Sequence, residues 1–142
     1  MLIQVTLIAI ATLLTSVCVA MPSVFSDTGN SFLKGFVNQE LLATLGVIVS
    51  ITLVSAGGLH IELGKVATRL SINLDRERQA VRYSAYLLIG LLVCALVLVV
   101  LKPVLATTER QTAFANGFGV FLLVWAIAVL YDLTRAAFSI NR

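Results

Sequence analysis

The chain has 142 residues, of which 59% are hydrophobic and only 12% are charged, and its mean hydropathy is +1.01. Soluble domains carry about 25% charged residues, so this composition excludes an ordinary water-soluble domain and indicates a surface that faces lipid. The formal net charge of +3 is not gathered on a basic face beside stacking aromatics, which argues against nucleic-acid binding.

Four apolar stretches dominate the chain, and they cover residues 2–20, 41–63, 83–101 and 113–131. A helix rises about 1.5 Å per residue, so about 20 residues cross a hydrocarbon core of about 30 Å. Each stretch comes close to that length. We therefore predict an all-α polytopic membrane protein, a single domain over residues 1–142 with four transmembrane helices in the lipid bilayer.

A polar connection over residues 21–40 follows the first stretch. No Lys or Arg precedes that stretch, so we interpret it as an uncleaved span rather than a signal peptide. Helix-breaking residues occur in the connection, namely Pro22, Asp27, Gly29 and Asn30. Aromatic residues recur in it as well, namely Phe25, Phe32 and Phe36. The connection either lies against the lipid headgroups or is an ordinary loop with aromatic anchors.

The second stretch is rich in small residues. Gly46 and Ser50 are four residues apart, so they share one face of a helix, and Gly57 lies further along. Small residues let helix backbones approach closely in lipid. We therefore predict that Gly46, Ser50 and Gly57 mark a packing seam or a pore, within one copy or between copies of a homo-oligomer. The alternative is the general enrichment of small residues in membrane helices.

The second helix is expected to continue past the membrane and to form a helical hairpin over residues 59–82. Its apolar stripe has spacings of four, three and four residues: Leu59, Leu63, Val66 and Leu70. Residues 71–74 predict a turn, with Asn73 as the cap of a new helix that runs into the third span. An apolar stripe exposed to water is unfavourable unless another surface buries it, so we expect it to bind a second copy or a cytoplasmic protein.

The hairpin also carries Arg76, Arg78 and Arg82 in its second half. They are candidates for binding an acidic partner surface or anionic lipid, unless they serve only to fix the orientation of the chain. His60 is a candidate pH sensor, because imidazole titrates near neutral pH. The alternative for His60 is a solvated residue at the end of the span.

The third stretch is the plainest, and Lys102-Pro103 is expected to end it. The basic residues predict the orientation of all four spans, because Lys and Arg resist translocation. Seven of the ten lie in the central connection and the C-terminal tail, and three lie on the other side. The hairpin and both termini should therefore face the cytoplasm, as in an N-in/C-in multi-pass protein of a bacterial inner membrane.

Nothing in the sequence predicts catalysis, a metal site or a cofactor. Ionisable residues do not occupy the middle of any predicted span, and no phosphate cradle, zinc ligand set or nucleophile–base arrangement is present. Cys18 and Cys94 fall inside predicted spans, where a thiol behaves as a small hydrophobe. We therefore expect a protein that is not an enzyme.

The segments 38–47 (NQELLATLGV) and 59–63 (LHIEL) resemble a pattern in small bacterial membrane proteins. The overall plan resembles the membrane component of the phage lambda exclusion system, which has a similar size and four spans. In both, the second span runs into a basic amphipathic connection before the third. The resemblance implies an inner-membrane effector that permeabilises the cell when a cytoplasmic sensor detects infection, and it assigns no functional residue.

Three functions remain open from the sequence. The first is an oligomeric membrane effector or channel-like protein that permeabilises the membrane in response to a cytoplasmic partner. The second is a non-catalytic membrane anchor that recruits a soluble partner. The third is a small transporter, which the lack of charge in the middle of the spans disfavours.

Overall fold

The computed structural model describes residues 2–70 and 74–139, and every regular element within these ranges is helical. Four long helices are α1 (Leu2–Ala20), α4 (Leu41–Leu70), α5 (Asp75–Leu105) and α6 (Glu109–Ser139). Two short helices and a π-helical turn lie between α1 and α4, namely α2 (Pro22–Phe25), α3 (Ser31–Gly35) and η1 (Phe36–Glu40). The prediction of an all-α fold is confirmed.

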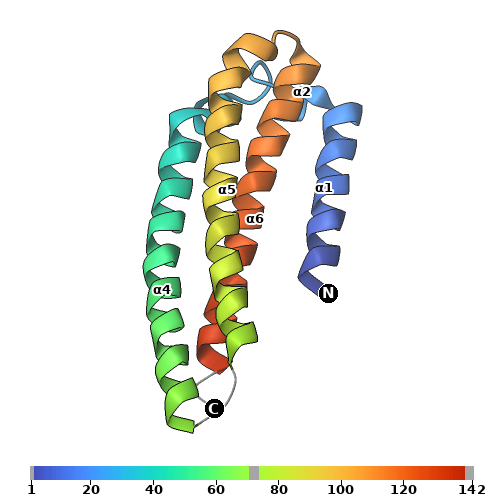
Figure 1. Cartoon of the computed structure of the whole chain (residues 1–142). Coiled ribbons are helices and arrows are strands. Elements are labelled where there is room, and N and C mark those ends of the chain that lie inside the picture. Colours follow the sequence, from blue (N-terminus) through green and yellow to red (C-terminus); the bar gives the residue numbers. More distant parts are fainter. Residues whose placement is uncertain (1, 71–73, 140–142) are drawn as a thin grey trace.

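The long helices run up and down in alternation (Figure 1). α4, α5 and α6 pack against one another, whereas α1 packs on α6 and on α2. Figure 1 shows α4 and α1 on opposite sides of the α5/α6 pair. The segment 21–40 lies at one end of the bundle, the cap end. The other end, where α4 is linked to α5 and where α6 finishes, is the hairpin end.

Three helical stretches are long and apolar enough to cross a membrane by length and composition: Ser31–Arg69, Asp75–Leu105 and Glu109–Ala137. Gln4–Ala20 is a shorter apolar helix. α4, α5 and α6 have 30, 31 and 31 residues. At about 1.5 Å per residue each is about 45 Å long, more than the ~30 Å hydrocarbon core. The chain is therefore compatible with a multi-pass membrane protein, and a crossing by α1 stays a prediction.

The hairpin end consists of two long helix ends. α4 runs without interruption to Leu70, and α5 begins at Asp75 with two carboxylates in its first turn. Carboxylates at that position suit the positive end of the helix dipole. Leu74 occupies the N-cap position of α5. The first three residues of the turn predicted at 71–74, including its proposed cap Asn73, lie outside the described residues.

α5 is longer than the sequence predicts, because Lys102-Pro103 does not end it and the helix continues to Leu105. A proline inside a helix removes one backbone hydrogen bond. So close to the end of α5 this loss does not stop the helix, since the Ala106 N–H reaches the Lys102 carbonyl at 2.9 Å. Lys102 therefore lies within the last turns of α5, next to the cap end.

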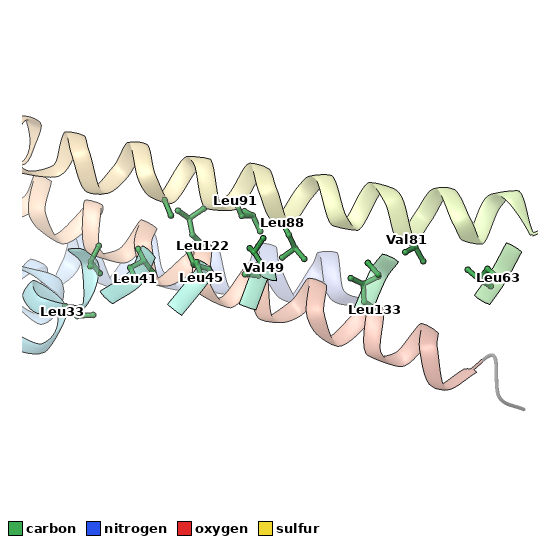
Figure 2. Close-up of a cluster of buried hydrophobic side chains, with 14 residues drawn as sticks. Leu33, Leu41, Leu45, Val49, Leu63, Val81, Leu88, Leu91, Leu122 and Leu133 are labelled. Atoms are coloured by element: carbon green, nitrogen blue, oxygen red, sulfur yellow. The ribbon is translucent and has the colours of Figure 1, made fainter. Parts of the chain in front are cut away.

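An apolar core runs along the bundle where α4, α5 and α6 face one another. In Figure 2 its side chains extend from Leu33 at the cap end to Leu63 at the hairpin end. Fully buried members include Leu41, Leu45, Leu88 and Leu122. The outer surfaces of the long helices are apolar too, with exposed Ile8, Val54, Val100 and Ile127. Helices that are apolar on every side are typical of a membrane protein.

Candidate functional site

A largely buried ion pair joins α5 to the segment 21–40. The ammonium Nζ of Lys102 donates to Oδ1 of Asp27 at 3.0 Å, and the two side chains are 10% and 25% exposed. Lys102 Nζ also donates to the carbonyl of Val37 at 3.3 Å. A charge this far out of water needs such partners, because an unpaired buried charge is strongly destabilising.

The Val37 carbonyl can accept this bond because the chain kinks at η1. Val37 (φ −80°, ψ 60°) and Asn38 (φ −150°, ψ −134°) leave helical geometry there. In an uninterrupted α-helix that carbonyl would accept from the N–H four residues later. Lys102 therefore satisfies a backbone acceptor that the kink releases, and its ammonium holds the kink against the end of α5.

Asn116 brings α6 into the same group of contacts. The residue is fully buried, and its Nδ2 donates to Asp27 Oδ1 at 2.8 Å and to the Phe25 carbonyl at 2.7 Å. Turning the amide round would set its oxygen against these two acceptors, so the donor bonds fix its orientation. Its Oδ1 is buried and has no hydrogen-bond partner in the described part of the chain. Asp27, Lys102 and Asn116 form the cap network.

The turn that carries Asp27 depends on local hydrogen bonds and on a glycine. Ser26 Oγ accepts from the Gly29 N–H at 3.1 Å and donates to Glu109 Oε1 of α6 at 3.3 Å. A Cβ added at Gly29 would collide with the Ser23 carbonyl. The absence of a side chain at Gly29 is therefore what lets this turn close and present Asp27 to Lys102.

The surroundings of Asp27 lower the pKa of its carboxyl group below the ordinary value. Burial alone raises this pKa, but the hydrogen bonds from Asn116 and Lys102 and the positive charges of Lys102 and Lys34 outweigh burial. Asp27 is therefore ionised at neutral pH, and its bond with Lys102 is an ion pair.

The cap network is suited to holding elements together rather than to catalysis. Asp27 Oδ1 already accepts from two donors, and the Lys102 ammonium already donates to two acceptors. A general base or nucleophile needs a free reactive atom beside an activating group, which these contacts do not provide. Among the described residues, no group of three or more His, Cys, Asp or Glu side chains could hold a metal. The network fastens the segment 21–40 across α5 and α6.

Spacing along the sequence could not reveal the cap network. Asp27 lies 75 residues from Lys102 and 89 residues from Asn116. From the sequence, Asp27 is interpreted only as a helix breaker, and Lys102 only as a topology signal and as part of the Lys102-Pro103 end of the third stretch. One sequence feature is consistent with the pair: Asp27 and Lys102 are both expected on the same side of the membrane, where they can meet. Asn116 is a polar side chain inside the fourth stretch, and lipid would leave it unpaired.

Gly46, Ser50 and Gly57 share a face of α4 that no other helix in the described part of the same copy covers. A Cβ at Gly46 or at Gly57 would meet no atom within 4 Å. Ser50 is exposed, and its Oγ donates to the Gly46 carbonyl at 2.7 Å. Successive helix residues are about 100° apart, which puts the three within about 40° of one another. These residues form the α4 open face, and contact between copies through it stays a prediction.

The apolar stripe of the hairpin packs largely inside the chain. Leu63 is 2% exposed and belongs to the core together with Val81 of α5. Leu59 and Val66 are half-buried. The chain itself covers the Leu63 side chain in this fold, and binding of a partner by the rest of the stripe stays a prediction. The side chain of Leu70 lies outside the described residues.

The three arginines of the hairpin have different surroundings. Arg76 and Arg82 are exposed, and their binding to a partner or to lipid stays a prediction. Arg78 is half-buried, and its Nη2 lies 3.1 Å from Nε2 of His60. The structure therefore brings the candidate pH sensor of α4 together with a guanidinium of α5. The sequence spacing of 18 residues does not indicate this contact.

An open apolar groove lies beside the cap network between α5 and α6. Its volume is about 600 Å³, and its lining includes Val97, Leu101, Phe114 and Phe118. Lys102 also belongs to the lining of this groove. In a bilayer, a surface of this kind contacts acyl chains or another helix.

Known protein families, curated proteins and solved structures contain no match to this chain. The fold and the contacts described here are therefore the basis on which its function must be inferred.

Proposed function

We propose that this chain is a non-enzymatic, oligomeric membrane effector that makes the bilayer permeable. Its four long helices cross a bacterial inner membrane, with the hairpin end and both termini in the cytoplasm. Copies associate through the α4 open face, and a cytoplasmic partner acting at the hairpin end triggers the change. The resemblance to the membrane component of the phage lambda exclusion system suggests a trigger connected with infection.

The α4 open face is the observation that carries this proposal. Gly46 and Gly57 leave space into which a helix backbone can approach, and no helix of the same copy uses that space. A large side chain close to them round the helix is apolar and exposed, namely Ile61 at 60%. Such a face gains packing energy in lipid only when another helix lies against it. A second copy supplies that helix.

The apolar core supports conduction between copies rather than through one copy. Leu41, Leu45, Leu88 and Leu122 fill the space between the three packed helices and are at most 2% exposed. An ion crossing there would meet no polar group from these side chains, which is very unfavourable. A path between copies would instead be lined by the α4 open face, where Ser50 supplies a hydroxyl.

Flux through reconstituted liposomes tests the proposal. The full chain is purified and inserted into vesicles that hold a fluorescent reporter of potassium flux. Wild type should release potassium, and Gly57→Leu should reduce the rate about tenfold or more, since about 1.4 kcal/mol of lost association is a factor of ten. Gly58→Leu is the matched control. Gly58 is exposed, has equally open space for a Cβ and lies about 100° away round the helix.

Two results would contradict the proposal. One is a wild-type chain that leaves the vesicles sealed at every protein density and applied potential. The other is an equal loss of flux in Gly57→Leu and Gly58→Leu, because the effect would then not belong to the α4 open face.

A non-conducting anchor is the second candidate, and the exposure of Arg76 and Arg82 at the hairpin end favours it. With Leu63 covered, a soluble partner would meet a basic rather than an apolar surface. In that case the vesicles stay sealed, and a complex isolated from native membranes weakens with salt. The double variant Arg76→Glu/Arg82→Glu should lose the complex, while Arg110→Glu at the cap end should keep it.

A further inference from the structure

The side chains of His60 and Arg78 meet between α4 and α5, within the hairpin. Nη2 of Arg78 lies 3.1 Å from Nε2 of His60. A guanidinium has donors and no acceptor, so Nε2 of His60 must be the acceptor and must carry no proton. The guanidinium also lies over Gly64, one turn further along α4, where an added Cβ would be 3.9 Å from its central carbon.

Another donor of Arg78 already lacks an acceptor, which makes the bond to His60 important for this guanidinium. Its Nε is buried and has no hydrogen-bond partner among the described residues. Loss of the bond to His60 would leave a second donor of the same guanidinium unpaired in a half-buried site, which is unfavourable. Loss of the contact should therefore weaken the packing of α4 against α5.

We propose that this contact is a proton-operated switch at the hairpin end. When His60 takes up a proton at Nε2, both ring nitrogens become donors and the ring becomes positively charged. The two atoms 3.1 Å apart then present two donors and two like charges, so the hydrogen bond is lost and the side chains repel. Acidification on the side of the membrane that holds the hairpin separates the ends of α4 and α5.

Other charged groups lie on the described parts of the helices at this end, and no salt bridge joins any of them to His60. In the described part of the chain, Arg78 is its hydrogen-bond partner, and no carboxylate lies in a salt bridge with it. On α4, Glu62 pairs with Lys65 in solvent at 3.3 Å. The remaining charged groups of the facing helices are Asp75, Arg76, Glu77 and Arg82 on α5, and Asp132 and Arg135 on α6.

Distance measurements between spin labels test the switch. Labels are placed on cysteines that replace the exposed residues Thr68 of α4 and Gln79 of α5, with Cys94 changed to Ser. The full chain is measured in liposomes at about pH 7.5 and about pH 5, which bracket the range in which imidazole titrates. The labelled protein that retains His60 should show one short distance between the labels at the higher pH. At the lower pH it should show a second population with a longer distance.

Two variants of His60 identify the responsible proton. His60→Gln offers Arg78 a carbonyl acceptor that does not titrate, so the short distance should persist at both pH values. His60→Lys carries a charge throughout this range, so the longer distance should appear at both. An unchanged distance in wild type, or an acid response that survives in His60→Gln, would overturn the switch. These two measurements decide the matter even if His60→Lys fails to fold.

The switch concerns contacts inside one copy of the chain, so it does not depend on association between copies. Sealed vesicles in the potassium assay would leave it standing. An unchanged label distance would likewise leave the α4 open face untouched.

Discussion

Replacing Lys102 with Met should destabilise the protein, because it removes one partner of the ion pair that closes the cap end. Met keeps much of the length of the side chain and loses the charge. Breaking a fully buried ion pair from one side costs about 3–5 kcal/mol. Asp27 is 25% exposed and keeps the hydrogen bond from Asn116, both of which reduce the cost. The Val37 carbonyl also loses its donor. We therefore expect a loss of about 2 kcal/mol.

Thermal unfolding of the purified protein in detergent measures this loss. For a domain of about 150 residues, 1 kcal/mol corresponds to about 2–4 °C in Tm, so Lys102→Met should unfold about 4–8 °C below wild type. Lys34→Met is a control from the same end of the bundle. Lys34 is exposed and acts on Asp27 only through its charge, so its removal should shift Tm by about 2 °C or less.

A double-mutant cycle separates the ion pair from other effects of the substitution. Asp27→Asn keeps an acceptor for Lys102 and Asn116 but loses the charge. The double variant Asp27→Asn/Lys102→Met leaves no unpaired charge, so it should be more stable than the sum of the single effects by about 1–2 kcal/mol. Strictly additive losses, or an unchanged Tm in Lys102→Met, would refute the assignment of the pair as the fastening of the cap end.

Three further predictions concern acid, a close packing contact and the core. Acid should weaken the fold below about pH 4, because the pKa of Asp27 is lower in the folded protein than in the unfolded chain. The stability that this difference gives is complete above the unfolded pKa of about 3.9. It is lost as the pH falls through the folded pKa. Gly119→Ala should cost about 1–3 kcal/mol, since its Cβ would lie 2.7 Å from Val37 Cγ1, whereas Gly57→Ala should change stability by less than about 1 kcal/mol. Leu63→Asp should cost at least about 3 kcal/mol, because it places an unpaired carboxylate in the core.

The same unfolding assay checks all three. Asp27→Asn should remove its share of the acid dependence, and an acid profile identical to wild type would show that Asp27 does not cause it. Equal stability of Gly119→Ala and Gly57→Ala would mean that α6 does not approach η1 as closely as described. A Leu63→Asp variant as stable as wild type would place Leu63 on the surface and restore it as a candidate docking residue.

Hydropathy and spacing were sufficient to predict the long helices. Runs of apolar residues long enough for a bilayer leave no alternative to helices, since lipid offers no partner for unpaired backbone groups. The continuous stripe from Leu59 onward also predicts that the second helix continues beyond its apolar stretch, and α4 does continue to Leu70. Which residues pack on the stripe could not be predicted. The same sequence pattern is expected whether Val81 of the same chain or a second protein packs on it.

The polar contacts between separate elements were not predictable, because each joins residues that the sequence keeps apart. Asp27 meets Lys102 and Asn116 only after the segment 21–40 folds back over α5 and α6. Helical spacing predicts contacts of His60 only with its neighbours on α4, whereas its partner Arg78 belongs to α5. In both places the packing of two separate elements decides the contact, and residue types alone do not determine how those elements pack.

Disulfide cross-linking in membranes tests most directly whether copies associate through the α4 open face. Ser50 and Ser55 are both exposed serines of α4 that donate to the carbonyl four residues earlier, and they lie about 140° apart round the helix. With Cys94 changed to Ser, mild oxidation should convert Ser50→Cys into covalent dimers and leave Ser55→Cys largely monomeric. Equal cross-linking of the two variants, or none in Ser50→Cys, would contradict the proposed assembly.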